Sequence, residues 1–291
     1  MKSPDFAYVR ADTLDAAFRL KAQHGADARW LAGGQSLLAA LAFRLSEPTA
    51  LIDISRIDVL QGIAVNGSMV RIGAGTTHTT IGASDIIRRH VPLLADAVPH
   101  IAHTAIRNRG TIGGSLAFAD PAAELPACCV ALEATFVAAS AKGERRISAR
   151  DFFHGVYATA LENDELLTAI EFPQAMAGDR HALIEITRRS GDYAMAGIAV
   201  ALRRSDDKID RVRLVFFALG DKPVVAHVAA GVLLGTDLDE DQIERAAKAV
   251  SADLDPPGDL NGGPEMKRHL AQVVLKRALL QILNNLMRMP A

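Results

Sequence analysis

Two short glycine-pair runs, LAGGQSL at 31–37 and TIGGSL at 111–116, carry the residue types and spacing that most clearly indicate chemistry. A Gly-Gly pair permits positive φ and lets backbone N–H groups converge with no Cβ in the way. Such amides attract an anion, and a helix beginning just behind them favours phosphate. Ser36 and Ser115 add a hydroxyl beside each pair. One such run is typical of a simple turn, whereas two, each expected after a strand, indicate a diphosphate or long nucleotide held between two lobes.

Other chemical motifs are missing from the sequence. The run GAGTTH at 73–78 begins as G-x-G, but His78 stands where a dinucleotide fingerprint needs its third glycine, and no P-loop run occurs. The two cysteines, Cys128 and Cys129, are adjacent, so they can neither form an unstrained disulfide nor surround a metal. We expect two buried packing thiols, no metal site, and no iron–sulfur cluster held by this chain alone, since a cluster takes about four thiolates.

The composition is that of an ordinary globular chain. Of its 291 residues, 49% are hydrophobic and 23% are charged, and 32 Lys+Arg against 34 Asp+Glu leave a net charge of −2. Nucleic-acid binding is not indicated, because it needs a basic excess on one face. No apolar run is long enough for a membrane span, and the opening MKSPDFAYVR lacks the apolar core of a signal peptide. A cytoplasmic protein is therefore expected.

The first glycine run is expected in a β–loop–α–β unit. ARWLAG is typical of a buried strand, SLLAALAFRL of a short helix and TALIDIS of a second strand, which places the glycines at the carboxyl end of a strand. A helix precedes this unit, with Thr13 as its N-cap and Gly25 as its stop.

From residue 57 the pattern changes. The NGS turn between alternating apolar residues predicts a hairpin over VLQGIAVNGSMVRIGAGTT. A helix is expected over IGASDIIRRHVPLLADAVPHIA, interrupted at Pro92, and strands are expected at ATFVAASA, RRISARDFF and ELLTAIEFP. The pattern breaks at FPQAMAGDR, near residue 175, which predicts a domain boundary there.

Beyond this boundary the sequence predicts an antiparallel sheet packed against helices. DYAMAGIAVALRR and IDRVRLVFFAL are expected as apolar strands joined by the polar turn SDDK, and helices are expected over DEDQIERAAKAV and PEMKRHLAQVVLKRALLQILNNLM. The apolar positions expected to share a helix face are Ile243, Ala247 and Val250 in the first helix, and Met266, Leu270, Val273, Val274 and Leu280 in the second.

Three motifs together resemble one known family. AGGQSLL, IRNRGTIGGSLAFADPAAELP and RRSGDYAMAG look like the motifs of the FAD-binding medium subunit of the molybdenum hydroxylases, and the chain has that subunit's length. This family includes the medium chains of carbon monoxide, nicotine, caffeine and aldehyde dehydrogenases and the flavin domain of xanthine dehydrogenase. The resemblance covers essentially the whole chain.

The resemblance implies an α+β fold in two domains. A two-subdomain FAD-binding domain of the vanillyl-alcohol-oxidase (PCMH) type is expected at residues 1–176, with its subdomains at about 1–56 and 57–176. A smaller C-terminal α+β domain like that of carbon monoxide dehydrogenase flavoproteins, an antiparallel sheet with helices, is expected at 177–291. FAD would lie extended between the two subdomains.

The resemblance also implies cofactor-binding positions. The first loop, which would wrap the diphosphate, comprises Leu31, Ala32, Gly33, Gly34, Gln35, Ser36 and Leu37. The second loop, on the other side of the same cofactor, comprises Thr111, Ile112, Gly113, Gly114 and Ser115. Glu124 would accept hydrogen bonds from the ribityl hydroxyls. Leu166 and Leu167 would pack beside the flavin or adenine, and Asp192 and Tyr193 would approach the isoalloxazine ring.

Four further residues have open or minor roles. Many relatives read AHADP where this chain reads AFADP, so Phe118 replaces a common His and alters the wall near the cofactor. Asp120 is either a turn residue or part of the site. His100 and His103 are spaced i, i+3 without a third ligand, so we expect a packing or surface role for both.

The resemblance implies an electron-relay subunit. Its expected partners are a large molybdenum-cofactor subunit and a small subunit with two [2Fe–2S] clusters, in a heterotrimer that pairs as (LMS)2. Electrons from the clusters would pass through FAD to NAD, a quinone, oxygen or another acceptor. No nucleophile–base pair stands out, so no catalytic side chain is assigned, which fits chemistry supplied by a cofactor. The alternatives are a stand-alone flavin oxidoreductase acting on a small molecule, and a binding module without flavin, which the intact glycine pairs argue against.

Overall fold

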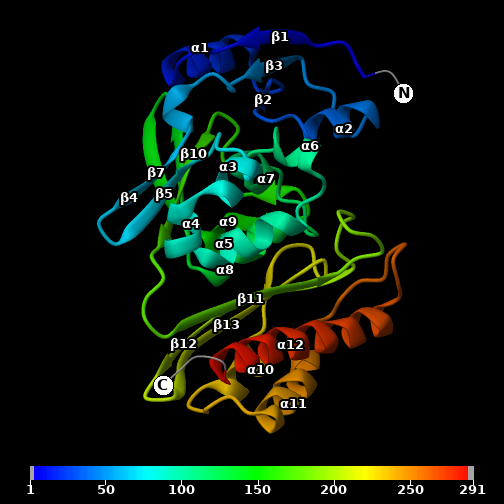
Figure 1. Cartoon of the computed structure of the whole chain (residues 1–291). Coiled ribbons are helices and arrows are strands. Elements are labelled where there is room, and N and C mark those ends of the chain that lie inside the picture. The colour runs from blue at the N-terminus through cyan, green and yellow to red at the C-terminus, as the bar shows by residue number, and fades with distance from the viewer. Residues whose placement is uncertain (1–2, 288–291) are drawn as a thin grey trace.

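A computed structural model describes residues 3–287, arranged in three tiers (Figure 1). A small sheet with two helices lies at the N-terminal end, a larger sheet with several short helices lies in the middle, and a third sheet with the C-terminal helices lies below. No helix within residues 3–287 is long and apolar enough to cross a membrane.

The N-terminal tier is a parallel sheet in the order β1–β3–β2, packed against α1. Its elements are β1 (Ala7–Arg10), α1 (Leu14–His24), β2 (Arg29–Leu31), α2 (Leu37–Ala42) and β3 (Ala50–Asp53). The Thr13 hydroxyl accepts the N–H of Ala16, and Gly25, with a φ of 78°, ends the helix, as predicted. The predicted strand–loop–helix–strand unit is confirmed, and the glycine run fills the loop between β2 and α2.

The middle tier is built on an antiparallel sheet in the order β4–β5–β10–β6–β7. Its strands are β4 (Ile63–Asn66), β5 (Met69–Gly73), β6 (Thr135–Ser140), β7 (Gly143–Ser148) and β10 (Leu166–Pro173). The predicted hairpin is confirmed: β4 and β5 pair around Gly67, whose φ is 60°. Strand β10 is central and buried along nearly its whole length, because strands flank it on both edges.

Short helices cover this sheet, where a single interrupted helix was predicted. They are α3 (His78–Ala83), α4 (Asp85–His90), α5 (Pro92–Ala97), α6 (Thr104–Arg107), α7 (Ile112–Phe118), α8 (Glu124–Ala131) and α9 (Ala149–Phe152). The tier also contains two 3-10 turns, η1 (Asp58–Leu60) and η2 (Val98–His100). A small strand pair, β8 (Phe153–Gly155) and β9 (Ala158–Thr159), completes it. The predicted break at Pro92 is confirmed, since Pro92 opens α5. A second break occurs at Ser84, because its hydroxyl accepts the N–H of Ile87 and begins α4.

The lower tier is an antiparallel sheet in the order β11–β12–β13–β14 with three helices. Its elements are β11 (Asp179–Ile186), β12 (Ala196–Ser205), β13 (Lys208–Phe217), β14 (Val224–Val225), α10 (His227–Leu233), α11 (Glu240–Ala249), the 3-10 turn η3 (Val250–Ala252) and α12 (Pro264–Met287). The β12–β13 pair is confirmed, but the predicted strand starts too early, because DYAM lies outside β12, which begins at Ala196. Strand β11 was not predicted, because its first residues, Asp179 to His181, are charged or polar.

Most positions predicted for the helix faces of this tier are buried or partly buried. Ile243, Ala247 and Val250 are buried, and Val274 is buried in α12. Met266 was assigned to the same face, but its side chain is 41% exposed, because the buried face of α12 begins at Lys267 and continues through Ala271 and Val274.

The third sheet has two covered faces. On β12, Ala199 belongs to the core shared with α5 and α8, whereas Val200 belongs to the core formed with α10, α11 and α12. On β13, Phe217 and Phe216 alternate in the same way. The middle and lower tiers therefore share one apolar core. The proposed division at residue 176 falls between β10 and β11 and stays a prediction.

Candidate functional site

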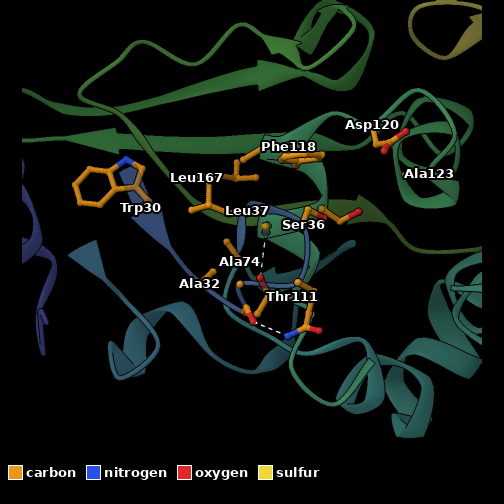
Figure 2. Close-up of a pocket in the computed structure, with 18 of the residues that line it drawn as sticks. Trp30, Ala32, Ser36, Leu37, Ala74, Thr111, Phe118, Asp120, Ala123 and Leu167 are labelled. Carbon is orange, nitrogen blue, oxygen red and sulfur yellow. Dashed lines mark hydrogen bonds between the residues drawn. The ribbon is translucent and has the colours of Figure 1, made fainter. Parts of the chain in front are cut away.

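A cavity of about 650 Å³ lies between the N-terminal tier and the middle tier. This volume falls within the roughly 300–1,000 Å³ that is typical of ligand and cofactor sites. Figure 2 shows Trp30 and Asp120 at its two ends, with Thr111 between them. The loop between β11 and β12 reaches the cavity with Gly191, so all three tiers contribute to its walls.

The structure brings most of the predicted site residues into this one cavity. Those that line it are Ala32, Gly33, Gly34, Gln35, Ser36, Leu37, Thr111, Gly113, Gly114, Ser115, Glu124, Leu166, Leu167, Asp192 and Tyr193. Leu31 and Ile112 do not line it: Leu31 ends β2, and Ile112 is fully buried in the core of the middle tier. Four segments far apart in the sequence thus meet around one space.

The glycines of the two runs allow a close approach of backbones. A Cβ on Gly33 would overlap the carbonyl oxygen of Arg109, in the segment just before the second run. A Cβ on Gly113 would lie 2.6 Å from the carbonyl oxygen of Ala74. Real Cβ atoms do not come this near, so the spacing of the runs depends on glycine at both positions. Of the four glycines only Gly34 has a positive φ, of 75°.

The second run differs from the prediction in two respects. It does not follow a strand: it follows α6 and opens α7, because the Thr111 hydroxyl accepts the N–H of Gly114 as an N-cap. Its N–H groups are also already engaged, since Ile112 donates to the Thr76 carbonyl and Gly113 to the Ala74 carbonyl. The second run can therefore offer a ligand its closely approaching backbone and its hydroxyl groups.

The first run keeps its donors available. Within residues 3–287, the backbone N–H groups from Gly33 to Leu37 have no acceptor in the protein. Only the side-chain amide of Gln35 is used, donating to the Gly33 carbonyl at 3.0 Å. Ser36 follows at the entrance to α2, and its hydroxyl makes no helix-capping hydrogen bond. Converging amides of this kind are an anion-binding arrangement.

Trp30 is held rigidly at one end of the cavity. Its ring N–H donates to the Glu165 carbonyl at 2.8 Å, Phe18 packs edge-on at 6.4 Å between ring centroids, and the Lys21 ammonium lies 5.9 Å from its ring centroid. Burial lowers the pKa of Lys21, which is anchored by the Ala28 carbonyl at 2.7 Å. Sequence reasoning missed Trp30, although it directly precedes the first run.

Ionisable groups gather at the other end. Burial raises the pKa of Glu124 from 4.5 to about 7, and the nearby Glu185 carboxylate adds to the effect. Burial also raises the pKa of Asp120. Its predicted turn is confirmed by the Ala122 N–H donating to its carboxylate at 2.9 Å, and it lines the cavity as well. Phe118 lines the cavity and packs against Tyr157, with ring centroids 4.9 Å apart.

The two histidines lie at least partly exposed, in keeping with the expected surface or packing role, and each makes a contact that the sequence did not indicate. His103 lines the cavity, and a Cβ on Gly191 would lie only 2.6 Å from its Cε1 atom. This contact sets the loop that carries Asp192 and Tyr193 against the middle tier. His100 lies with its Nδ1 atom 3.2 Å from Oε1 of Glu185, on β11. A sequence signal for His103 was its position eight residues before the second run.

Metal-ligating clusters are not part of this site. Within the described residues, no group of three His, Cys, Asp or Glu side chains is arranged to hold a metal ion. Cys128 and Cys129 are free and buried in α8, which confirms the predicted packing position.

Comparison with known proteins identifies the family. Residues 4–175 match the FAD binding domain in molybdopterin dehydrogenase, and residues 181–282 match the CO dehydrogenase flavoprotein C-terminal domain. The chain belongs to the FAD-binding medium subunits of molybdenum-containing dehydrogenases. It is an oxidoreductase subunit of the α+β fold class predicted from the sequence.

Individual medium subunits are similar over their whole length. The medium chain of carbon monoxide dehydrogenase from Hydrogenophaga pseudoflava is 37% identical, over 96% of this chain and 97% of that one. Subunit alpha of the 6-hydroxypseudooxynicotine dehydrogenase complex of Paenarthrobacter nicotinovorans is 37% identical, over 98% of this chain and 96% of that one. A solved carbon monoxide dehydrogenase from Hydrogenophaga pseudoflava superposes with a TM-score of 0.94 at 38% identity, covering 98% of this chain and 99% of that chain.

The residues present in this medium subunit fit FAD. The first glycine run offers unpaired amides, and Cβ atoms at Gly33 or Gly113 would collide with neighbouring backbone. The cavity is lined by the aromatic Trp30 and by the ionisable Glu124 and Asp120, and Figure 2 shows Trp30 and Asp120 far apart on its wall. An adenine and a flavin separated by a diphosphate match this order of aromatic, amide and polar surfaces.

Proposed function

We propose that this chain holds FAD in the cavity and relays electrons within a molybdenum hydroxylase. The observation that carries the proposal is the meeting of both glycine runs, Glu124, Leu167 and the Asp192–Tyr193 loop around one cavity of about 650 Å³. When bound, FAD supplies the redox chemistry, because a flavin accepts electrons singly or in pairs. The electrons would come from [2Fe–2S] clusters of a small subunit and leave to NAD, a quinone, oxygen or another acceptor.

The residues of the chain have distinct parts in this proposal. Amides from Gly33 to Leu37 would bind the diphosphate, with the Ser36 and Ser115 hydroxyls beside it. The second run would bring the backbone near Gly114 against the cofactor. Trp30 would close the adenine end, and the Tyr193 loop would border the isoalloxazine end.

The proposed partners follow from the relatives. A large molybdenum-cofactor subunit and a small [2Fe–2S] subunit would complete the enzyme, with two such heterotrimers paired as (LMS)2. Within residues 3–287 no three-residue metal-ligating group occurs, so clusters and molybdenum would reside in the partners. A stand-alone oxidoreductase is not favoured, because the chain matches medium subunits along their whole length.

Cofactor preference tests this proposal directly. The full chain, freed of ligand, would be dialysed against FAD or FMN and the bound flavin measured by visible absorbance. FAD should bind with a dissociation constant at least about tenfold lower than that of FMN, since only FAD reaches the Trp30 end. Equal binding of both, or retention of neither, would refute the assignment of the cavity.

Electron relay needs its own measurement. The FAD-loaded chain, mixed anaerobically with the reduced partner subunits, should lose its flavin absorbance as the clusters reoxidise. A chain that binds FAD but remains oxidised under these conditions would contradict the relay and leave FAD binding intact.

A further inference from the structure

A second, smaller cavity lies between the middle tier and the lower tier. Its volume is about 190 Å³, and none of the residues that line it also lines the larger cavity. Its walls come from the ends of α4 and α8, the start of α5, the segment after β10, and the strands β11, β12 and β13. A volume below the roughly 300–1,000 Å³ of sites for drug-sized ligands suits a small ion.

Three arginines line this cavity from neighbouring strands. Arg203 on β12 lies directly opposite Arg211 on β13, and Arg213 lies two residues further along β13. They share the sheet face of Ala199 and Val215, which packs against the middle tier, because side chains on one face recur at every second residue. Like charges directly opposite each other on a sheet are destabilising. The three arginines therefore need counter-charges.

Two carboxylates of the chain meet these arginines. Asp179 on β11 accepts hydrogen bonds from Nε of Arg203 at 2.7 Å and from its Nη2 atom at 3.3 Å. Glu133, just after α8, accepts one from Nη1 of Arg211 at 3.3 Å and also pairs with Arg213. Among the described residues that line the cavity, these two are the only Asp or Glu.

Both carboxylates are ionised near neutral pH. The hydrogen bond from Arg213 lowers the pKa of Glu133, against the effect of burial. Burial alone would raise the pKa of Asp179, but hydrogen bonds from Arg203 and from the Met176 N–H lower it. Three guanidinium groups thus face two carboxylates, which leaves one positive charge without a counter-charge among these five groups.

Two of the arginines also keep donors for a ligand. A guanidinium has five N–H groups, and within residues 3–287 the side chains of Arg211 and Arg213 donate hydrogen bonds to Glu133 alone. The planar fork of such donors matches the oxygens of a phosphate or a similar anion. Arg180 lines the same cavity, and its Nη1 atom donates to the Asp179 carbonyl at 2.8 Å.

We propose that Arg203, Arg211 and Arg213 bind a phosphate-type oxyanion in this smaller cavity. The anion supplies the third counter-charge, and its oxygens accept hydrogen bonds from Arg211 and Arg213. Bound at the boundary between the middle and lower tiers, it stabilises the folded chain by mass action. The site is independent of FAD, since the two cavities share no lining residue.

Titration of the full chain with inorganic phosphate tests this site. The chain is loaded with FAD, because the free amides of the first glycine run would otherwise attract phosphate as well. Calorimetry at low ionic strength should show saturable binding with a dissociation constant of about 1 mM or lower. The melting temperature should rise with phosphate but not with chloride at equal ionic strength. A parallel titration with glycerol 3-phosphate shows whether a free phosphate or a phosphate ester binds more tightly.

Two variants with opposite effects on the charge locate the anion. Arg211→Gln removes a positive charge and several donors, so it should weaken phosphate binding at least about tenfold. Glu133→Gln removes the carboxylate that competes for Arg211 and Arg213, so it should tighten binding about two- to fivefold. Both side chains are about half exposed, at 48% and 47%, so neither change removes packing from the core.

The matched control is Arg268→Gln. Arg268, on α12, is 40% exposed and pairs with Asp255 at 2.6 Å, but it does not line the cavity. The control changes the net charge of the chain by the same amount as Arg211→Gln. It should bind phosphate with the affinity of the wild type.

The outcomes separate this site from the proposed function. Phosphate binding that does not saturate up to about 10 mM would overturn the anion site. Equal weakening by Arg211→Gln and Arg268→Gln would reveal a general charge effect and overturn it too. If the chain retains no FAD, the same variants locate the phosphate, because they lie outside the larger cavity. Phosphate binding that depends on Arg211 in such a chain would remove the proposed function and leave the anion site standing.

Discussion

Glu124 makes the stability of the cofactor-free protein depend on pH. Its pKa is raised by burial from 4.5 to about 7 in the folded state, so its contribution to stability is fully present below pH 4.5 and is lost as the pH rises through 7. The Glu124→Gln variant cannot ionise at this position, so it does not lose this stability as the pH rises. The free energy of unfolding of the variant should equal that of the wild type at pH 4.5 and exceed it by about 3 kcal/mol at pH 8.5.

Urea denaturation at the two pH values measures this difference. Glu144→Gln, at an exposed glutamate on β7, is the control and should show no such change between them. A pH-independent difference between Glu124→Gln and wild type would contradict the burial argument.

Gly33 makes a second prediction at the scale of single residues. An alanine here would overlap the Arg109 carbonyl and force the two glycine runs apart. Gly33→Ala should therefore weaken FAD binding by about 1–3 kcal/mol, measured by equilibrium dialysis.

Gly231→Ala is the matched control. Gly231 lies in α10 with no atom near its absent Cβ, and alanine favours helices by about 1 kcal/mol over glycine. This variant should keep full FAD affinity. Equal affinity of Gly33→Ala and wild type would mean that the loops adapt and that their spacing is not set by glycine.

At the scale of elements, the β11–β12 loop depends on Gly191. Its φ is 85°, and a Cβ would strike the His103 ring. Gly191→Ala should displace Asp192 and Tyr193 and raise the access of iodide to bound flavin, seen as stronger quenching of flavin fluorescence.

The Gly235→Ala variant distinguishes the effect of backbone strain from the effect of the contact with His103. Gly235 has a similar φ of 76° but nothing near its absent Cβ, so both variants should lose about 1 kcal/mol of stability to backbone strain. Only Gly191→Ala should change iodide quenching. The same quenching in both variants would show that the His103 contact does not position the loop.

Local chemistry explains which elements were predictable from the sequence. Thr13, the NGS turn and Pro92 act within a few residues, so the cap of α1, the β4–β5 hairpin and the start of α5 could be derived. Strand β11 could not, because its burial comes from distant helices, and its polar opening residues hide the alternation.

The residues of the site also divide into those that the sequence could predict and those that it could not. Motif residues such as Gly33 and Glu124 follow from resemblance, and the structure collects them in the cavity. Trp30 and His103 could not be placed, since each reaches the cavity through a contact with another tier. For Asp120 the sequence left open the choice between a turn and the site, and the structure shows both. The engaged N–H groups of the second run were also hidden, because their acceptors lie on the segment from Ala74 to Thr76.

At the scale of the whole molecule, the shared core makes a prediction about the two domains. Leu183, Val215 and Phe217 of the lower tier complete the core of the middle tier. Each buried side chain of this size contributes about 1.5–3 kcal/mol, and their sum is a large part of the roughly 5–15 kcal/mol that stabilises a domain. Residues 1–176 alone should therefore melt at a lower temperature and bind the dye ANS.

Adding residues 177–291 as a separate chain tests whether the lost core is the cause. Recovery of the melting temperature, followed by circular dichroism, is expected because the two pieces rebuild the shared core. An isolated 1–176 chain as stable as the whole protein would contradict the coupling of the tiers.

Trp30 is the single tryptophan of the chain, and it lies at the end of the cavity where the adenine is proposed to bind. Its emission overlaps the absorption of oxidised flavin, so excitation energy passes from the indole to a flavin bound in the same cavity. The protein therefore contains a built-in optical sensor of its cofactor. The ultraviolet fluorescence of unlabelled protein would report loading, loss and reduction of the flavin in real time.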